Sequence, residues 1–275
     1  TTVGQQTIFI GQSPTVTFTS NAPVCQDATV NFNNIGSTGG QYSFFWDFGA
    51  GAVPFTSTTE NPSGIQYNFA GDKVITFSIF DANCSQTITD TITINPIPTA
   101  SFISTTPVCN GDSVDFFNTG TGGAAYSWNF GSGASPATDT VENPQNVVYS
   151  TAGSKTITLI TTLGLCSSTS VQVIVVTETP APSFALIAPQ CEGTAINFNY
   201  IGTSGPGWTF LWDFGFGANP SNSSQTSPLG IVYAGSGSKT VLLTVSNGAC
   251  TATTTQTFTI NQTPVAGFTY NSTGC

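Results

Sequence analysis

Cysteines recur at nearly constant intervals along this chain of 275 residues and mark out an internal repeat. The first cysteine of each copy is Cys25, Cys109, Cys191 or Cys275. Successive copies therefore begin 84, 82 and 84 residues apart. A second cysteine follows in the complete copies, at Cys84, Cys166 and Cys250. A fixed period of this length predicts a row of small, similar domains rather than one large core.

The repeat frame predicts three complete units with a fragment at each end. The predicted divisions are 1–13, the last strand of a preceding unit; 14–97, 98–181 and 182–263, three whole units; and 264–275, the first strand of a following unit. In this frame Cys275 is the opening cysteine of the last fragment. We therefore expect a section of a longer array, or alternatively a subunit whose loose end strands complete its neighbours.

Short segments with apolar residues two positions apart dominate each unit, and none has a helical period with caps. Val30 and Phe32, for example, would share one face of a strand. Turns rich in glycine, Asn-Pro or Ser-Pro separate these segments. The expected fold is all-β: antiparallel β-sandwiches in a linear array. We expect their cores to contain the recurrent tryptophans Trp46, Trp128 and Trp212.

The composition excludes several classes of partner. The chain has thirteen acidic residues, three lysines and no histidine, for a net charge of −10. Nothing in it could neutralise phosphates, so we expect no nucleic acid partner and no anionic membrane surface. The sequence contains no apolar run long enough to span a bilayer, and we expect no membrane insertion in this segment. Paired cysteines at fixed places predict disulfides and hence an extracellular or cell-surface location.

The sequence predicts no catalytic residues and no tightly held cofactor. Without histidine the chain cannot form a Ser-His-Asp or Cys-His arrangement, and its cysteines lack the C-x-x-C spacing of zinc sites. The carboxylate pair Asp112 and Asp115 does not recur in the other units, which argues against a glycosidase site. The one metal that we consider is calcium, bound weakly by the loops around Asp47 and Asp213.

The disulfide pairing depends on how many strands separate the two cysteines of a unit. Pairing within units would join Cys25 to Cys84, Cys109 to Cys166 and Cys191 to Cys250, closing 59, 57 and 59 residues. Each closure would add about 4 kcal/mol in the chain-entropy model. Four clear strands lie between the two cysteines, an even number that returns the chain to one end of the sandwich. We therefore predict the pairing within units, whereas one more strand between the tryptophan and the tyrosine would favour bonds between units, such as Cys25 to Cys166.

The most specific run is WDFG at position 46, which recurs as WNFG at 128 and WDFG at 212. In each unit Asn-Pro or Ser-Pro, a tyrosine and Gly-x-Lys follow. This pattern resembles the PKD (polycystic kidney disease) domain family, an immunoglobulin-like sandwich, over all three units. The family usually reads WDFGDG. Here the second acid is replaced by Ala50, Ser132 and Phe216, and the first by Asn129 in the second unit, which argues against an acidic, calcium-holding loop.

Tandem PKD-like domains with such a cysteine pair resemble those of very large secreted surface proteins of gliding Bacteroidetes. The resemblance implies a non-enzymatic segment of a long extracellular filament or adhesin stalk, whose partners are neighbouring repeats and other copies in a filament. The alternatives are a carbohydrate-binding or spacer module of a secreted hydrolase, and a donor-strand-assembled fibre subunit. For surface glycans Trp208 is the contact we consider, although such a residue more often covers the next domain.

Three short triplets of aspartate, a hydroxyl residue and an aliphatic residue resemble the O-glycosylation signal of Bacteroidetes. The predicted acceptors are Thr91, Ser113 and Thr140.

Overall fold

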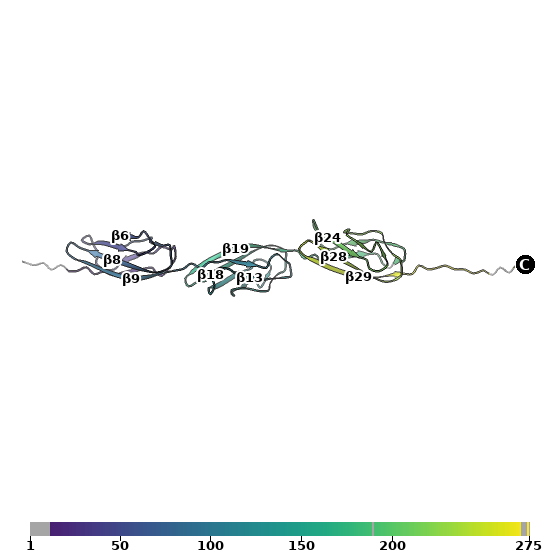
Figure 1. Cartoon of the computed structure of the whole chain (residues 1–275), viewed down its shortest axis with the longest axis horizontal. Coiled ribbons are helices and arrows are strands. Elements are labelled where there is room, and N and C mark those ends of the chain that lie inside the picture. Colours follow the sequence, from purple (N-terminus) through teal and green to yellow (C-terminus); the bar gives the residue numbers. More distant parts are fainter. Residues whose placement is uncertain (1–11, 189, 271–273, 275) are drawn as a thin grey trace, which may run out of the picture.

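The computed structural model describes residues 12–188, 190–270 and 274. The regular secondary structure of these residues consists of β-strands. The strands form three sandwiches that lie end to end (Figure 1). Most of the predicted first fragment, residues 1–11, lies outside the described residues, as does Cys275. Residues 264–270, the main described part of the predicted first strand of a following unit (264–275), run beyond the third sandwich without strand pairing.

The first unit contains nine strands. They are β1 (Phe18–Ser20), β2 (Val24–Cys25), β3 (Phe32–Asn34), β4 (Ser43–Asp47), β5 (Ala52–Val53), β6 (Thr56–Ser57), β7 (Gln66–Tyr67), β8 (Gly71–Phe80) and β9 (Ser85–Asn95). One sheet has the order β2-β9-β8-β4-β6. The pairs β1-β3 and β5-β7, with an isolated bridge between Val30 and Ile65, form the opposite layer.

The second unit repeats this plan. Its strands are β10 (Phe102–Ser104), β11 (Val108–Cys109), β12 (Ser113–Val114), β13 (Phe116–Asn118), β14 (Ala125–Asn129), β15 (Ala134–Ser135), β16 (Thr138–Asp139), β17 (Val147–Tyr149), β18 (Gly153–Leu163) and β19 (Cys166–Thr177). The large sheet has the order β11-β19-β18-β14-β16, and the facing strands pair as β10-β13 and β12-β17-β15.

The third unit has the same order again. Its strands are β20 (Phe184–Leu186), β21 (Gln190–Cys191), β22 (Ala195–Ile196), β23 (Phe198–Tyr200), β24 (Thr209–Asp213), β25 (Ala218–Asn219), β26 (Asn222–Ser223), β27 (Ile231–Tyr233), β28 (Gly237–Ser246) and β29 (Thr251–Asn261). Its sheets are β21-β29-β28-β24-β26, β20-β23 and β22-β27-β25.

Each unit has its own aromatic core between the two layers. Trp46, Trp128 and Trp212 are 0%, 1% and 0% exposed. In the first unit the Trp46 ring stacks on Phe77 of β8, with ring centroids 3.6 Å apart. The alternating residues Ile75, Phe77 and Ile79 of β8 are all fully buried. Because aromatic and β-branched side chains fill the inner faces while threonine and serine fill the outer ones, the period-2 pattern of the sequence becomes two packed layers.

Candidate functional site: the junctions between units

The recurrent tryptophan and tyrosine are both used inside their own units. Each tryptophan donates its indole N–H to a backbone carbonyl 13 residues further on, that of Thr59, Val141 or Gln225, at 3.0, 2.9 and 2.9 Å. Each tyrosine hydroxyl donates to the carbonyl of the phenylalanine in the WDFG run, as Tyr67 does to Phe48 at 2.9 Å. Buried polar atoms need such partners, so these bonds account for the fixed spacing of the two residues.

The aspartate of the WDFG run closes a turn. In the first unit Asp47 Oδ1 accepts the backbone N–H of Gly49 at 2.9 Å, and in the second unit Asn129 Oδ1 makes the same bond to Gly131 at 2.9 Å. Gly49 has φ +74°, and a Cβ there would lie 2.6 Å from the carbonyl oxygen of Val74. An oxygen acceptor and a glycine are what this turn requires, and an amide serves as well as a carboxylate. The calcium expectation at Asp47 and Asp213 stays a prediction.

The Asn-Pro element anchors the loop before the tyrosine to the small facing sheet. Asn61 Oδ1 accepts the N–H of Asn34 at 2.8 Å, and the Pro62 carbonyl accepts the N–H of Phe32 at 2.9 Å. In the third unit Ser227 Oγ replaces the amide oxygen and accepts the N–H of Tyr200 at 3.1 Å. Serine and asparagine serve alike here because each places a side-chain oxygen where it accepts the corresponding backbone N–H.

The single lysine of each unit lies over the ring of the recurrent tyrosine. Lys73, Lys155 and Lys239 place Nζ 5.8, 5.6 and 5.6 Å from the centroids of the Tyr67, Tyr149 and Tyr233 rings, which is cation–π range. Burial raises the pKa of Tyr149 to about 12. Burial, with a smaller contribution from Asp213, raises the pKa of Tyr233 to about 12. These phenols are therefore neutral structural donors and have no acid–base role near neutrality.

The cysteines are the recurrent residues that a unit does not use internally. Cys84 precedes β9, and Cys25 in β2 pairs in parallel with β9 beside Asn95, the last residue of that strand. The 11 residues of β9 therefore separate the two cysteines by roughly 35 Å at about 3.3 Å per residue. A disulfide needs Cα atoms within about 7 Å. The two cysteines of one unit lie at opposite ends of the sandwich and cannot bond to each other.

The predicted pairing within units is wrong for this reason. The short segment of β5 and β6 lies between the tryptophan strand β4 and the tyrosine strand β7, and β6 pairs antiparallel with β4. This segment is a fifth passage of the chain along the sandwich, in addition to the four strands that are clear in the sequence. With an odd number of passages, the second cysteine lies at the opposite end of the sandwich from the first. Neither the predicted Cys25–Cys84 pair nor its counterparts in the other units form.

Instead, the disulfides join consecutive units. Cys25 bonds to Cys166 and Cys109 bonds to Cys250, with Cα–Cα distances of 5.7 and 5.9 Å. Each bond links the edge strand at the far end of one unit to the hairpin tip at the near end of the next unit. The first bond joins β2 to the start of β19, and the second joins β11 to the residue just before β29. The cross-unit alternative, with Cys25 bonded to Cys166, is therefore the arrangement in the structure. Cys84 and Cys191 are unbonded among the described residues.

Polar contacts tie the connecting segments to the same junctions. After the second unit, the Thr179 N–H donates to Asn110 Oδ1 at 2.6 Å and its hydroxyl donates to the Asn110 carbonyl at 2.9 Å. From the third unit, Asn247 Nδ2 donates to the carbonyl of Glu178. Pro98 and Pro180, which stand at equivalent places in the two connections, are buried. Hydrogen bonds to both neighbouring units thus hold the second connection, and a buried proline packs in each of the two.

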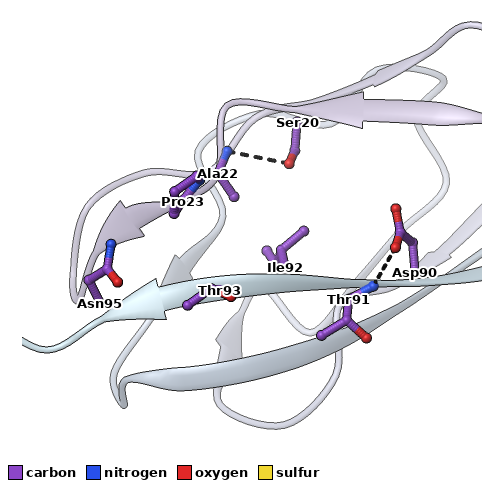
Figure 2. Close-up of a pocket in the computed structure, with 8 residues that line it drawn as sticks. All are labelled: Ser20, Ala22, Pro23, Asp90, Thr91, Ile92, Thr93 and Asn95. Carbon is purple, nitrogen blue, oxygen red and sulfur yellow. Dashed lines mark hydrogen bonds between the residues drawn. The ribbon is translucent and has the colours of Figure 1, made fainter. Parts of the chain in front are cut away.

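The three predicted glycosylation acceptors are accessible. The side chains of Thr91, Ser113 and Thr140 are exposed. Thr91 is one of the residues that line a groove of about 480 Å³ between β9 and the β1–β2 connection. Figure 2 shows the Asp90 and Ile92 side chains on the side of β9 that faces this connection and the Thr91 side chain on the other side. The Asp90 carboxylate there accepts the backbone N–H of Thr91 at 2.7 Å. Glycosylation at these residues stays a prediction.

Two other predicted surface features have structural uses. Trp208 is partly buried and packs against the core of its own unit. Contact with surface glycans and cover for the next domain, the two roles considered for it, stay predictions. Asp115 Oδ1 accepts the N–H of Asn146 at 2.9 Å, across the loop before β17. Residues 12–188, 190–270 and 274 contain no group of three or more His, Cys, Asp or Glu side chains placed to hold a metal ion.

The described part of the chain has no helix of the length and apolarity needed to cross a membrane. No protein-family profile matches the chain, and no curated protein matches it in sequence.

Solved structures match the fold. The I-band fragment I67-I69 of titin aligns with 93% of this chain and 100% of its own at 12% identity, with a TM-score of 0.50. Extracellular domains 3-5 of Drosophila OTK align with 88% of this chain and 93% of their own at 12% identity, with a TM-score of 0.38. The three N-terminal domains of the bacteriophage RB49 Hoc protein align with 92% and 99% at 10% identity, with a TM-score of 0.37. The likeness to the titin fragment shows the fold, a tandem row of immunoglobulin-like sandwiches.

Proposed function

We propose that this chain is a non-enzymatic structural segment of a long extracellular filament or cell-surface adhesin stalk, built from PKD-like units. The units have separate cores, and their recurrent motif residues are occupied by bonds that hold each sandwich together. What remains for function is the way in which the units are joined.

The observation that carries the proposal is the pair of disulfides between units. Each one bridges 141 residues of chain, and together they cover both junctions. Tension applied along the row passes from Cys25 to Cys166 through the disulfide, so most of the first unit and most of the second lie inside a closed loop that cannot be drawn out. A row of sandwiches joined in this way keeps its length even if a sandwich unfolds, which suits a stalk.

The same bonds support an extracellular setting. Disulfides persist in oxidising surroundings such as the cell exterior, and thiols in the cytosol are kept reduced. The scarcity of lysine and the absence of arginine also leave trypsin-like proteases few cleavage sites, which suits an exposed and durable part.

The test of location and form is labelling of intact producing cells with an antibody raised against the chain, followed by electron microscopy. The proposal predicts label along surface filaments or stalks without permeabilisation. Label that appears only after permeabilisation, or that co-purifies with a secreted hydrolase, would contradict it.

The mechanical part has its own test in single-molecule pulling. A variant that retains only Cys25–Cys166, with the other five cysteines replaced by serine, is stretched between its two ends before and after reduction. Reduction should lengthen the fully unfolded chain by the 141 residues of the closed loop, which is about 500 Å at roughly 3.6 Å per residue. The all-serine variant is the control, because reductant should leave its length unchanged.

A further inference from the structure

Two cysteines of the described chain have no partner, and they lie toward opposite ends of the row of units. Cys84 is in the first unit and is half-buried, whereas Cys191 is in the third unit and is exposed. They belong to different classes. Cys191 is an edge-strand cysteine like Cys25 and Cys109, and Cys84 is a hairpin cysteine like Cys166 and Cys250.

Cys191 has the same backbone setting as its bonded counterparts. It pairs in parallel beside Asn261, as Cys25 pairs beside Asn95. The residue after it donates its N–H to the Asn261 carbonyl at 2.9 Å, and the corresponding bond after Cys25 is 2.8 Å. The Cys191 carbonyl accepts an N–H three residues on at 3.1 Å, against 3.0 Å at Cys25. The strand end that positions a bonded cysteine is thus already formed at Cys191.

Cys84 has the same turn as the bonded Cys250. Asp81 Oδ1 accepts the Cys84 N–H at 2.6 Å, and Asn247 Oδ1 accepts the Cys250 N–H at 2.8 Å. The Cys84 carbonyl accepts the Asp81 N–H at 2.9 Å, and the equivalent bond at Cys250 is 3.1 Å. The hairpin tip that presents a bonded cysteine to the preceding unit is therefore also formed at Cys84.

We propose that Cys84 and Cys191 are the two open ends of one staggered disulfide series, and that each bonds to the complementary cysteine of a further unit of this repeat. Cys191 takes a hairpin cysteine, and Cys84 takes an edge-strand cysteine. Two cysteines of the same class do not pair. The inference rests on the geometry of the junctions and holds whether the array serves as a stalk or as a spacer.

The bond forms by oxidation of two thiols. The Cys191 thiolate attacks a small-molecule disulfide such as oxidised glutathione and releases one glutathione thiolate. The hairpin cysteine of the incoming unit then attacks the mixed disulfide at the Cys191 sulfur and releases the second. Two protein thiols lose two electrons and two protons, and one glutathione disulfide becomes two glutathione thiols.

A continued series would create two interleaved covalent paths along the array. Cys84 is followed by Cys109, and Cys166 by Cys191, after 25 residues in each case. In each path, 25-residue segments alternate with disulfides, and there is one segment for every two units. A segment of this length spans at most about 90 Å when fully extended, at roughly 3.6 Å per residue, so the array would be inextensible beyond that limit.

The further unit has two sources, a second copy of this chain or an additional unit of the same polypeptide, and two experiments distinguish them. The first uses the chain with Cys275→Ser and adds either Cys84→Ser, which leaves Cys191, or Cys191→Ser, which leaves Cys84. Each variant is incubated alone and mixed with the other in a glutathione redox buffer, and products are mapped by mass spectrometry without reduction. A covalent heterodimer with a Cys84–Cys191 peptide, and no homodimer of either variant, is expected if second copies suffice.

The second experiment extends the polypeptide by placing another copy of residues 110–181 directly after Cys275. The appended Cys166 then follows Cys191 by 141 residues, the separation of both disulfides in the structure. Cys191 should become resistant to alkylation and appear in a peptide bonded to the appended cysteine. In the control, with the appended cysteine replaced by serine, Cys191 should be alkylated while amide exchange shows the appended unit folded.

The heterodimer supports the proposal with a second copy as the source. No heterodimer together with a bonded Cys191 in the extended chain supports it with the same polypeptide as the source. Homodimers of either variant that match the heterodimer in yield, or a Cys191 that stays reactive in both experiments while the appended unit is folded, would overturn it.

Discussion

Removal of the Cys25–Cys166 disulfide should destabilise the first unit while leaving the third unaffected. When the first unit opens with the second still folded, the disulfide closes the opened chain into a loop of about 75 residues, worth roughly 4 to 5 kcal/mol in the chain-entropy model. A loss of that size corresponds to amide exchange at least a thousandfold faster, since about 1.4 kcal/mol is tenfold. The change is Cys25→Ser together with Cys166→Ser.

The assay is hydrogen exchange of the intact chain read by mass spectrometry. The amides of β8 in the first unit, which pair with β4 on one side and β9 on the other, report the opening of that unit. The amides of β28 report the third unit and should not change. Because Cys166 is 1% exposed, the single Cys25→Ser variant keeps that buried sulfur and separates the loss of the bond from a packing defect. Exchange in β8 accelerated less than tenfold in both variants would refute the reasoning.

Other predictions concern the motif residues and the surface, and denaturant unfolding measures the first three. Gly49→Ala should lower the free energy of unfolding by about 3 kcal/mol, because it combines a left-handed φ with a Cβ against the Val74 carbonyl. Gly64→Ala, which has open space at φ +76°, should lower it by about 1 kcal/mol. Equal losses would contradict the close approach at Gly49. Asp47→Asn should change stability by less than about 0.5 kcal/mol and Asp47→Ala should lose about 1 kcal/mol, since only an oxygen acceptor is needed. With free thiols alkylated, stability should fall as the pH rises above 10, because the unfolded state loses the Tyr149 proton near pH 10 and the folded state only near pH 12. This residue alone contributes about 1.4 kcal/mol per pH unit between those values. Tyr149→Phe should make the fall shallower. The mass of protein from its natural producer should exceed the sequence mass by glycan increments that vanish when Thr91, Ser113 and Thr140 are replaced by alanine, and an unmodified mass would contradict the glycosylation prediction.

The repeated core of this fold is visible in the sequence because the physics is local. Residues such as Ile75, Phe77 and Ile79 alternate along a strand long enough for the period to show, and all three are buried. The tryptophan and tyrosine recur at constant spacing because each makes a bond that fixes its distance along the chain. Loops between these points vary in length without altering the frame.

The disulfide pairing could not be predicted in the same way, because it depends on a feature that leaves almost no pattern. β5 and β6 contain two residues each, Ala52–Val53 and Thr56–Ser57, too few to show alternation. Yet their presence changes an even number of traverses into an odd one and moves the second cysteine to the other end of the sandwich. The packing of Trp208 against its own unit was not predicted for a related reason: it depends on how the glycine-rich loop folds back on the unit, which composition does not reveal.

The disulfide map of the native, oxidised protein tests the central claim most directly. The protein is digested without reduction by a protease of broad specificity, with free thiols blocked beforehand, and the linked peptides are identified by mass spectrometry. The account predicts Cys25 linked to Cys166 and Cys109 linked to Cys250. A map that instead links Cys25 to Cys84 and Cys109 to Cys166 would contradict it, because each unit would then be closed on itself and nothing covalent except the backbone would join the row.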